Sequence, residues 1–370
     1  MKITKAAAVA TIAVLCGMQA FAGTLVGNDA LHHQSRPQEE GIAAARLPYR
    51  EELVDFDNPA AAGVRLAGTL TLPQGAGPFP AVVFISGSGP NGRDEEQAGH
   101  KLALVLADAL TRDGCAVLRY DKRGVAKSTG DYAAATTLDF ASDATAAVAF
   151  LRGRSDIVRA KVGLIGHSEG GTTAAMVAAK DPSLAFIVMM AGFTIPGKIL
   201  VAEQTRRIAI ADGQAHAIAT QTYNLNRRLY DAIAASKDQS DAEARVRKIL
   251  AATKPKPEKD QADQAILFTK LPSMRFILAF DPAPILDDVR VPVLALYGSK
   301  DLVVPADLNL PVLREALTHD GDVTIKEMPG LNHLFQHAKT GSLREFEEIE
   351  ETLSPEVMVI ISKWVAQHTS

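Results

Sequence analysis

The 370-residue sequence predicts an α/β fold, a mostly parallel central sheet with helices on both faces and a helical segment inserted between two strands. Between residues 51 and 193, short apolar runs alternate with helical stretches, as they do in a sheet built from crossover units. From residue 194 to 280 the alternation stops and the chain reads as helical. We therefore expect an α/β core formed by residues 51–193 and 281–370, with a helical lid at 194–280.

The composition is that of an ordinary globular protein, with 47% hydrophobic and 22% charged residues. The formal net charge is −4, and the lysines and arginines are dispersed along the chain. No basic stripe with interleaved aromatic residues occurs in the sequence. A nucleic-acid partner is therefore not expected.

The first 22 residues have the pattern of a secretory signal peptide. A basic start, MKITK, precedes the apolar run AAAVATIAVLCGM, and Ala20-Phe21-Ala22 resembles a cleavage site. The run is short for a membrane span and no later segment is long enough, so we expect export to the periplasm or the medium, with no transmembrane span after cleavage. The alternative is an anchor that is never cut. Cleavage would remove Cys16 and leave Cys115, which excludes an internal disulfide.

The predicted elements of the core follow one another in regular order. Residues 23–50 show no periodicity and are expected to form an irregular lead-in, where His32 and His33 lack other ligands at metal-like spacing. EELVDF and VRLAGTLTLP, joined by NPAAAG, then predict a β-hairpin. There follow the strand PAVVFIS, the helix KLALVLADAL, the strand CAVLRYD, the helix LDFASDATAAVAFLRG with Thr136 or Thr137 as N-cap, the strand VGLIG, a helix from about Gly171 to Ala179 and the strand LAFIVMMA. The insertion, which TKPKPEKD interrupts, precedes the strands PVLALYG and VTIKEMPG and a helix ending near Trp364.

A candidate nucleophile lies in VGLIGHSEGG, which contains the pattern GxSxG at residues 166–170. The pattern alone is weakly specific. Here it joins a predicted strand to a predicted helix, where glycines permit the strained turn that exposes a serine hydroxyl at the edge of a sheet. We assign Ser168 as the nucleophile; the alternative is a serine that only caps the helix.

A serine hydroxyl needs a base, and the base needs a carboxylate that orients it. In this kind of fold the three residues occur along the chain in the order Ser, Asp, His. Asp301 follows the strand PVLALYG and His333 follows the strand VTIKEM. Both therefore lie at the carboxyl ends of strands, the edge where open α/β sheets place their sites. We assign Asp301 as the acid and His333 as the base.

Other histidines and acids are possible substitutes for these two. The candidates are His337, His100, His216, Asp307 and Asp121. His100 and His216 are predicted to lie on helical stretches before the carboxylate. For Asp121, which ends the strand CAVLRYD, a structural ion pair with Arg123 is favoured.

The loop SGSGPNGRDEE, which follows the strand PAVVFIS, contains GxGxxG at residues 87–92 and allows two interpretations. In a dinucleotide site the pyrophosphate would rest on the N-terminus of the next helix. Residues 93–96 place three carboxylates against one guanidinium there, and Pro90 removes a backbone donor, so an anion would be repelled. We therefore assign the loop to an oxyanion hole whose donors are the backbone amides of Ser88 and Glu169.

Taken together, these segments resemble the α/β-hydrolase superfamily, and within it the bacterial esterase branch of EstD-type carboxylesterases and dienelactone-hydrolase-like proteins. The resemblance covers about residues 51–195 and 281–365 and is carried by LAGTLTLP, PAVVFISGSGPNGRDE, GHKLALVLADAL, VLRYDKRGVAKSTGDY, TLDFASDATAAVAFLR, IGHSEGG, PVLALYGSKDLVVP and GLNHLF. It implies the same nucleophile, acid and base. Ala126 stands in RGVAKS where such proteins usually carry glycine, which puts the geometry of that loop in question.

The expected function is hydrolysis of small-molecule carboxylic esters through an acyl-enzyme. No metal or organic cofactor is expected, because the chain supplies the nucleophile, the base and the anion stabiliser. The oligomeric state is not indicated. A serine peptidase of the prolyl-oligopeptidase or aminopeptidase type is one alternative, for which Glu203, Asp212 and Asp231 could capture a peptide amine. A non-catalytic binding module is the other, and it would leave Ser168 inert toward a fluorophosphonate.

Overall fold

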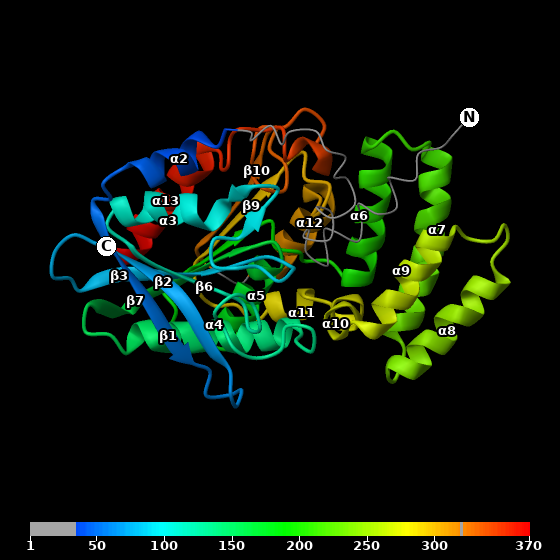
Figure 1. Cartoon of the computed structure of the whole chain (residues 1–370), viewed down its shortest axis with the longest axis horizontal. Helices are drawn as coiled ribbons and strands as arrows, with labels where there is room; N and C mark the ends of the chain where they lie inside the picture. Colours follow the sequence, from blue (N-terminus) through cyan, green and yellow to red (C-terminus); the bar gives the residue numbers. More distant parts are fainter. Residues whose placement is uncertain (1–34, 319–320) are drawn as a thin grey trace.

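The computed structural model describes residues 35–318 and 321–370, which are organised around one large sheet (Figure 1). Its strands are β1 (Tyr49–Asp57), β2 (Arg65–Pro73), β3 (Phe79–Ile85), β6 (Ala116–Tyr120), β7 (Ile157–His167), β8 (Ile187–Met190), β9 (Val293–Gly298) and β10 (Val323–Met328). They lie in the order β1-β2-β6-β3-β7-β8-β9-β10. β2 is antiparallel to β1 and to β6, and every other neighbouring pair is parallel. The predicted mostly parallel sheet and its hairpin are confirmed.

Helices cover both faces of this sheet (Figure 1). One face carries α3 (Leu102–Arg112) and α13 (Pro355–Thr369), and the other carries α4 (Thr137–Arg152), α5 (Glu169–Ala178) and the short α11 (Ala283–Leu286). α12 (Ala306–Ala316) packs near β10. Val82, Leu164 and Val188, on three central strands, are completely buried. Burial on both faces explains why these strands read as continuous apolar runs rather than as alternating patterns.

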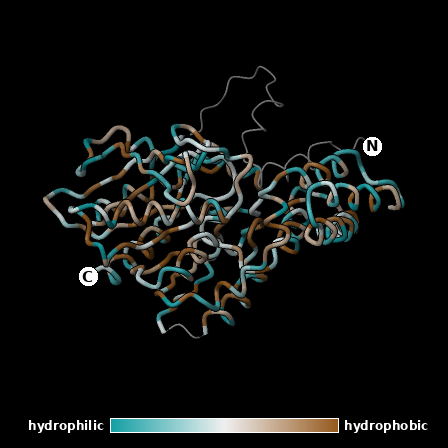
Figure 2. The backbone as a smooth tube through the Cα atoms, turned by 90° about the horizontal axis from the view of Figure 1, so that it is seen from below, coloured by the Kyte–Doolittle hydropathy of each residue, from teal (hydrophilic) through white to brown (hydrophobic). Residues whose placement is uncertain are grey.

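Five helices in succession follow β8 and precede α11: α6 (Gly197–Ala211), α7 (His216–Ala234), α8 (Gln239–Ala252), α9 (Lys259–Lys270) and α10 (Pro272–Ala279). They stand beyond α12 at one end of the sheet (Figure 1). Their apolar sides form a second core, which includes Val201, Leu229, Tyr230 and Phe268. Figure 2 shows hydrophilic and hydrophobic positions mixed over this group of helices, as amphipathic helices require.

The expectation of an irregular lead-in is wrong for residues 37–44, which form the helix α2 (Pro37–Ala44). This helix buries none of its residues, so no apolar period marks it in the sequence. Polar contacts hold it instead. The Arg36 guanidinium donates to the backbone oxygens of Glu347 and Ile349, both at 2.9 Å, and Gln38 Nε2 donates to Leu353 O at 2.8 Å. The predicted signal peptide and the His32-His33 pair lie outside the described residues.

Ala126, in the loop after β6, has a φ of 49°, the left-handed conformation that glycine adopts without strain. The loop therefore keeps a glycine-like backbone despite the substitution. We expect Ala126→Gly to raise the free energy of unfolding by about 1 kcal/mol, measured by urea denaturation. Ala134, exposed in the next turn, is not among the residues with positive φ, so Ala134→Gly should instead lower stability. Equal effects of both substitutions would contradict this account.

Candidate active site

Ser168 occupies the sharp turn between β7 and α5, with φ 55° and ψ −122°. Its N–H donates to Met190 O at 2.8 Å, which ties the turn to the neighbouring strand. A Cβ at Gly166 would lie 2.0 Å from Gly170 O, and a Cβ at Gly170 would lie 2.0 Å from Ile85 O. Both glycines are therefore required by close backbone approach. The Ser168 side chain makes no capping hydrogen bond to α5, so the alternative of a simple helix cap does not hold.

Asp301 and His333 are joined directly. His333 Nδ1 lies 2.8 Å from Asp301 Oδ2, and both side chains are buried. Asp301 Oδ1 accepts the backbone N–H groups of Val303 at 2.7 Å and Val304 at 2.8 Å, which fixes the orientation of the carboxylate. An ionised carboxylate only accepts, so the His333 proton is held on Nδ1 and Nε2 is left as an acceptor.

The His333 loop lies directly against the serine turn. The His167 and His333 rings have centroids 4.8 Å apart, and His167 Nε2 lies 2.9 Å from His333 O. Among the described residues, no hydrogen bond joins the Ser168 hydroxyl to His333 Nε2. Hydrogen bonds of this kind are often long or poorly aligned without substrate and tighten in the complex.

The loop after β3 forms the other wall beside Ser168. A Cβ at Gly87 would stand 3.0 Å from both Ser168 Cβ and Glu95 Oε1, so a larger residue would have to displace these neighbours. Asn91 Nδ2 donates to Gly87 O at 2.8 Å and to Ser88 O at 3.0 Å, which holds the loop in shape. Within the described part of the chain, the backbone amides of Ser88 and Glu169 have no hydrogen-bond acceptor. Two amides are thus free on either side of the serine.

A buried pair that the sequence did not single out, Glu95 and His167, links these loops. Glu95 Oε1 accepts the Gly87 N–H at 2.5 Å and lies 3.1 Å from His167 Nδ1. His167 reaches the His333 backbone through its other ring nitrogen. Glu95 has a φ of 50°, a strained conformation that its contacts with Gly87 and His167 hold in place. Burial acts to lower the pKa of His167, but the Glu95 carboxylate beside it outweighs burial, and the pKa of His167 is raised.

This pair predicts a pH-dependent stability. The pKa of His167 is raised on folding, so its contribution to the free energy of unfolding is complete below about pH 6.5 and disappears as the pH rises through the raised value. Glu95→Gln removes the charge and keeps an acceptor for Gly87. We expect the free energy of unfolding of the wild type to exceed that of this variant by about 2 kcal/mol at pH 5 and by less at pH 8, measured by urea unfolding.

Burial lowers the pKa of His100, so this residue contributes a pH dependence of stability in the opposite direction. Because His100 is present in both proteins, its contribution cancels in the difference between their free energies of unfolding. Glu96→Gln, which changes the exposed neighbour, is the control and should show no such trend. A difference between wild type and Glu95→Gln that stays constant from pH 5 to 8 would contradict a charged His167.

The alternative bases lie elsewhere. His337 is exposed and pairs with Glu351 at 2.9 Å. The prediction that His100 lies on a helix is wrong. His100 belongs to the short strand β5 (His100–Lys101), which pairs with β4 (Glu96–Gln97). Its ring bonds to Phe346 O and Thr352 Oγ1, so hydrogen bonding rather than a helical face accounts for its burial. His216 is the first residue of α7.

The alternative acids have structural partners. Asp307 pairs with Arg207 of α6 at 2.7 Å. The expected pairing of Asp121 with Arg123 is wrong, because Asp121 instead binds Arg93, with Oδ2 2.7 Å from Nη2. The Arg123 guanidinium is directed to the start of α4, where it binds Asp139 and Asp143. The chain leaves β6 after Tyr120 and turns at Arg123, so the rule that residues i and i+2 of a strand share a side does not apply to Asp121 and Arg123.

Three carboxylates of the helical insertion, those considered as ligands for a peptide amine, are also paired. Glu203 lies 2.5 Å from Arg206, and Asp231 lies 2.9 Å from Lys198. Asp212 accepts a hydrogen bond from Ser342 and lies 3.2 Å from Arg344. Each of the three acids considered for binding a peptide amine thus already has a cationic partner within the protein.

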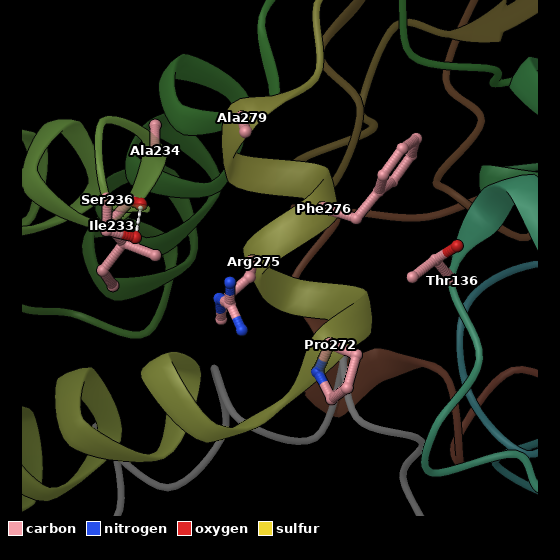
Figure 3. Close-up of a pocket in the computed structure, with 8 residues that line it drawn as sticks. All are labelled: Thr136, Ile233, Ala234, Ser236, Pro272, Arg275, Phe276 and Ala279. Atoms are coloured by element: carbon pink, nitrogen blue, oxygen red, sulfur yellow. Dashed lines mark hydrogen bonds between the residues drawn. The ribbon is translucent and has the colours of Figure 1, made fainter. Parts of the chain in front are cut away.

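Two cavities open beside the insertion. One, of about 300 Å³, is lined by Thr136, Ile233, Ala234, Ser236, Pro272, Arg275, Phe276 and Ala279 (Figure 3). In Figure 3, Arg275 lies on the side of α10 toward α7, and Phe276 on the side toward Thr136. The second, of about 480 Å³, lies next to Phe280 and Lys198. Ser168, Asp301 and His333 line neither cavity, but Thr137, the neighbour of Thr136, bonds to Glu169 beside the serine.

Within residues 35–318 and 321–370, no group of three or more His, Cys, Asp or Glu side chains has the arrangement of a metal site. No helix in these ranges has both the length and the apolar character needed to span a membrane. Cys115 is buried with a free thiol.

Comparisons with known proteins agree with this fold. Residues 62–314 match the family model of the X-Pro dipeptidyl-peptidase (S15 family). Esterase EstD of Thermotoga maritima is 26% identical over 272 residues, which make up 73% of this chain; the chain spans 58% of the length of that relative.

Among solved structures, an esterase from Pyrococcus furiosus superposes with a TM-score of 0.53 at 13% identity, covering 88% of this chain and 93% of its own. The proline iminopeptidase of Mycobacterium smegmatis superposes with a TM-score of 0.52 at 18% identity, covering 86% and 99%. At identities this low, the two superpositions show a shared fold alone.

Proposed function

Since the chain belongs to the X-Pro dipeptidyl-peptidase (S15) family and has the α/β-hydrolase fold, we propose that it is a serine hydrolase that cleaves carboxylic esters. One observation carries the proposal: a histidine oriented by a fixed carboxylate lies against the strained serine turn, with free amides on either side. The likeness to esterase EstD supports an ester as substrate.

The reaction proceeds in two steps. His333 Nε2 takes the proton of Ser168 as the hydroxyl attacks the ester carbonyl, while Asp301 stabilises the imidazolium that forms. The amides of Ser88 and Glu169 bind the oxyanion, and each contributes on the order of 3 kcal/mol to transition-state stabilisation. His333 then protonates the departing alcohol. Water, deprotonated by the same imidazole, releases the acid and restores Ser168.

The helical insertion supplies the substrate-binding region in this proposal. Three aromatic rings lead from the end of β8 to the smaller cavity: Phe193 contacts Phe280 with centroids 6.2 Å apart, and Phe280 stacks on Phe276 at 5.1 Å. Thr172 of α5 donates to Phe193 O at 2.9 Å, so this row begins beside the nucleophile helix. A row of aromatic rings suits the acyl chain or aromatic part of an ester.

Peptide hydrolysis is a second candidate, favoured by the family match. It would require a free carboxylate to bind the peptide amine, whereas Glu203, Asp212 and Asp231 are all neutralised by cations. We therefore place it behind ester hydrolysis.

The test is an activity screen over nitrophenyl esters of short and long acyl chains and over aminoacyl-proline nitroanilides. The proposal expects turnover of the esters at rates well above those of the amides, and labelling of Ser168 by a fluorophosphonate, located by peptide mass spectrometry. Turnover of the amides without the esters would favour a peptidase. Absence of both turnover and labelling would favour a binding module.

We also propose that residues 1–22 direct export and are then removed. A bacterial host that secretes the full-length chain should yield a mature protein whose N-terminal sequence begins at Gly23. Replacing Ala22 with a bulky residue should slow or abolish this cleavage. Retention of Met1 in the exported protein would contradict the proposal.

A further inference from the structure

Lys122, in the loop after β6, carries a buried ammonium group that the mechanism above does not use. Its side chain is 4% exposed. Nζ donates to Gly87 O at 2.6 Å, lies 3.5 Å from Glu169 Oε2 and stands 4.2 Å from the centroid of the Phe140 ring. An ammonium group is costly to bury without partners, so these three contacts account for its presence here.

The two polar partners of Lys122 are the residues that present the two free amides. Gly87 O belongs to the same peptide group as the Ser88 N–H, and Glu169 contributes the other N–H. The shorter contact, at 2.6 Å, is the one to the peptide carbonyl rather than the one to the carboxylate. Lys122 thus stands behind the oxyanion hole and touches both of its walls.

We infer that Lys122 is a positioning residue that acts through the Gly87–Ser88 peptide and strengthens its N–H as a donor to the oxyanion; this inference rests on the proposed function. A cation bonded to a peptide oxygen draws electron density from the peptide nitrogen, and hydrogen bonds in series polarise one another. The low dielectric of a buried site preserves the effect. The benefit arises when negative charge develops on the substrate, and not on substrate binding.

The loop does not need Lys122 to keep its shape. Asn91 Nδ2 also donates to Gly87 O, and the Gly87 N–H is bound by Glu95. The carbonyl therefore retains a partner when the ammonium is removed, which separates the effect of its charge from that of loop geometry. Glu169 Oε1 accepts from Thr137 Oγ1 at 2.6 Å and likewise keeps a partner.

The test compares Lys122→Met with the double variant Lys122→Met/Glu169→Gln, using a nitrophenyl ester turned over by the wild type. The double variant removes both buried charges, so it distinguishes loss of the ammonium from the effect of an unpaired carboxylate. Lys127→Met is the matched control, because Lys127 is exposed on the same loop. Thermal unfolding of each variant shows that it is folded.

The expected result is a kcat about 10- to 100-fold lower in both Lys122 variants, with KM within about threefold of wild type and a matching loss in the rate of fluorophosphonate inactivation. Lys127→Met should equal wild type. A double variant with wild-type kcat would overturn the inference, as would a loss confined to KM. Failure of the proposed function is a separate result, seen as no ester turnover by the wild type or as undiminished turnover by Ser168→Ala.

Discussion

Ser168→Ala is expected to lower kcat/KM for nitrophenyl esters by about 10⁴-fold or more, because the alanine offers no oxygen to form the acyl-enzyme. The fold should persist. The Ser168 side chain makes no cap to α5, and its backbone is held by the bond from its N–H to Met190 O, which alanine retains. The measurement is steady-state hydrolysis beside circular dichroism and a thermal unfolding curve.

Ser183→Ala provides the matched control, since Ser183 is exposed in the loop after α5 and its hydroxyl bonds to Asp181. It should keep wild-type activity and fluorophosphonate labelling, whereas Ser168→Ala should lose both. Residual hydrolysis by Ser168→Ala at more than a few per cent of wild type would remove Ser168 from the nucleophile role. Labelling of another residue in that variant would identify the replacement.

The parts of this protein that could be predicted from sequence are those that local rules determine. Buried strands read as apolar runs, and Gly166 and Gly170 mark a turn that their close backbone approach explains. Asp301 and His333 were placed by the chain order and by the ends of their strands, and the structure brings them to 2.8 Å of each other. Their catalytic roles, with that of Ser168, remain proposals for the experiments above.

The parts that could not be predicted depend on buried charges whose partners are distant in the chain. Glu95 contacts His167, Lys122 contacts Glu169, and Arg93 rather than Arg123 binds Asp121. In the sequence, the three carboxylates of residues 94–96 indicate only a group of negative charges that would repel an anion. In the fold, a buried charged group is stable only beside a counter-charge or a hydrogen-bond partner, and the packing of distant segments determines which partner that is.

The second large effect is expected from Asp301→Asn, which should lower kcat for ester hydrolysis by about 10⁴-fold with little change in the fold. The backbone amides of Val303 and Val304 both donate to Asp301 Oδ1. Asparagine has a single carbonyl oxygen, and these two donors will hold it in that position. The amide nitrogen, a donor, must then face His333 Nδ1.

This reversal sets the tautomer of His333. With a donor in front of it, Nδ1 can only accept, so the ring proton moves to Nε2. An Nε2 that carries a proton cannot take one from the serine, although the overall geometry is unchanged. The expected signature is therefore a loss in kcat with KM nearly constant and with an unaltered thermal unfolding curve.

Asp307→Asn tests the same change at the alternative acid. Asp307 pairs with Arg207 on the surface of the insertion, so this substitution should leave kcat within about twofold of wild type, as expected for an exposed pair. If Asp307→Asn removed activity while Asp301→Asn retained it, the acid would be misassigned. If Asp301→Asn merely destabilised the protein and kept its kcat, the bond between Asp301 and His333 would be structural, and the orientation of the imidazole would have to come from the contact between His167 Nε2 and the His333 backbone.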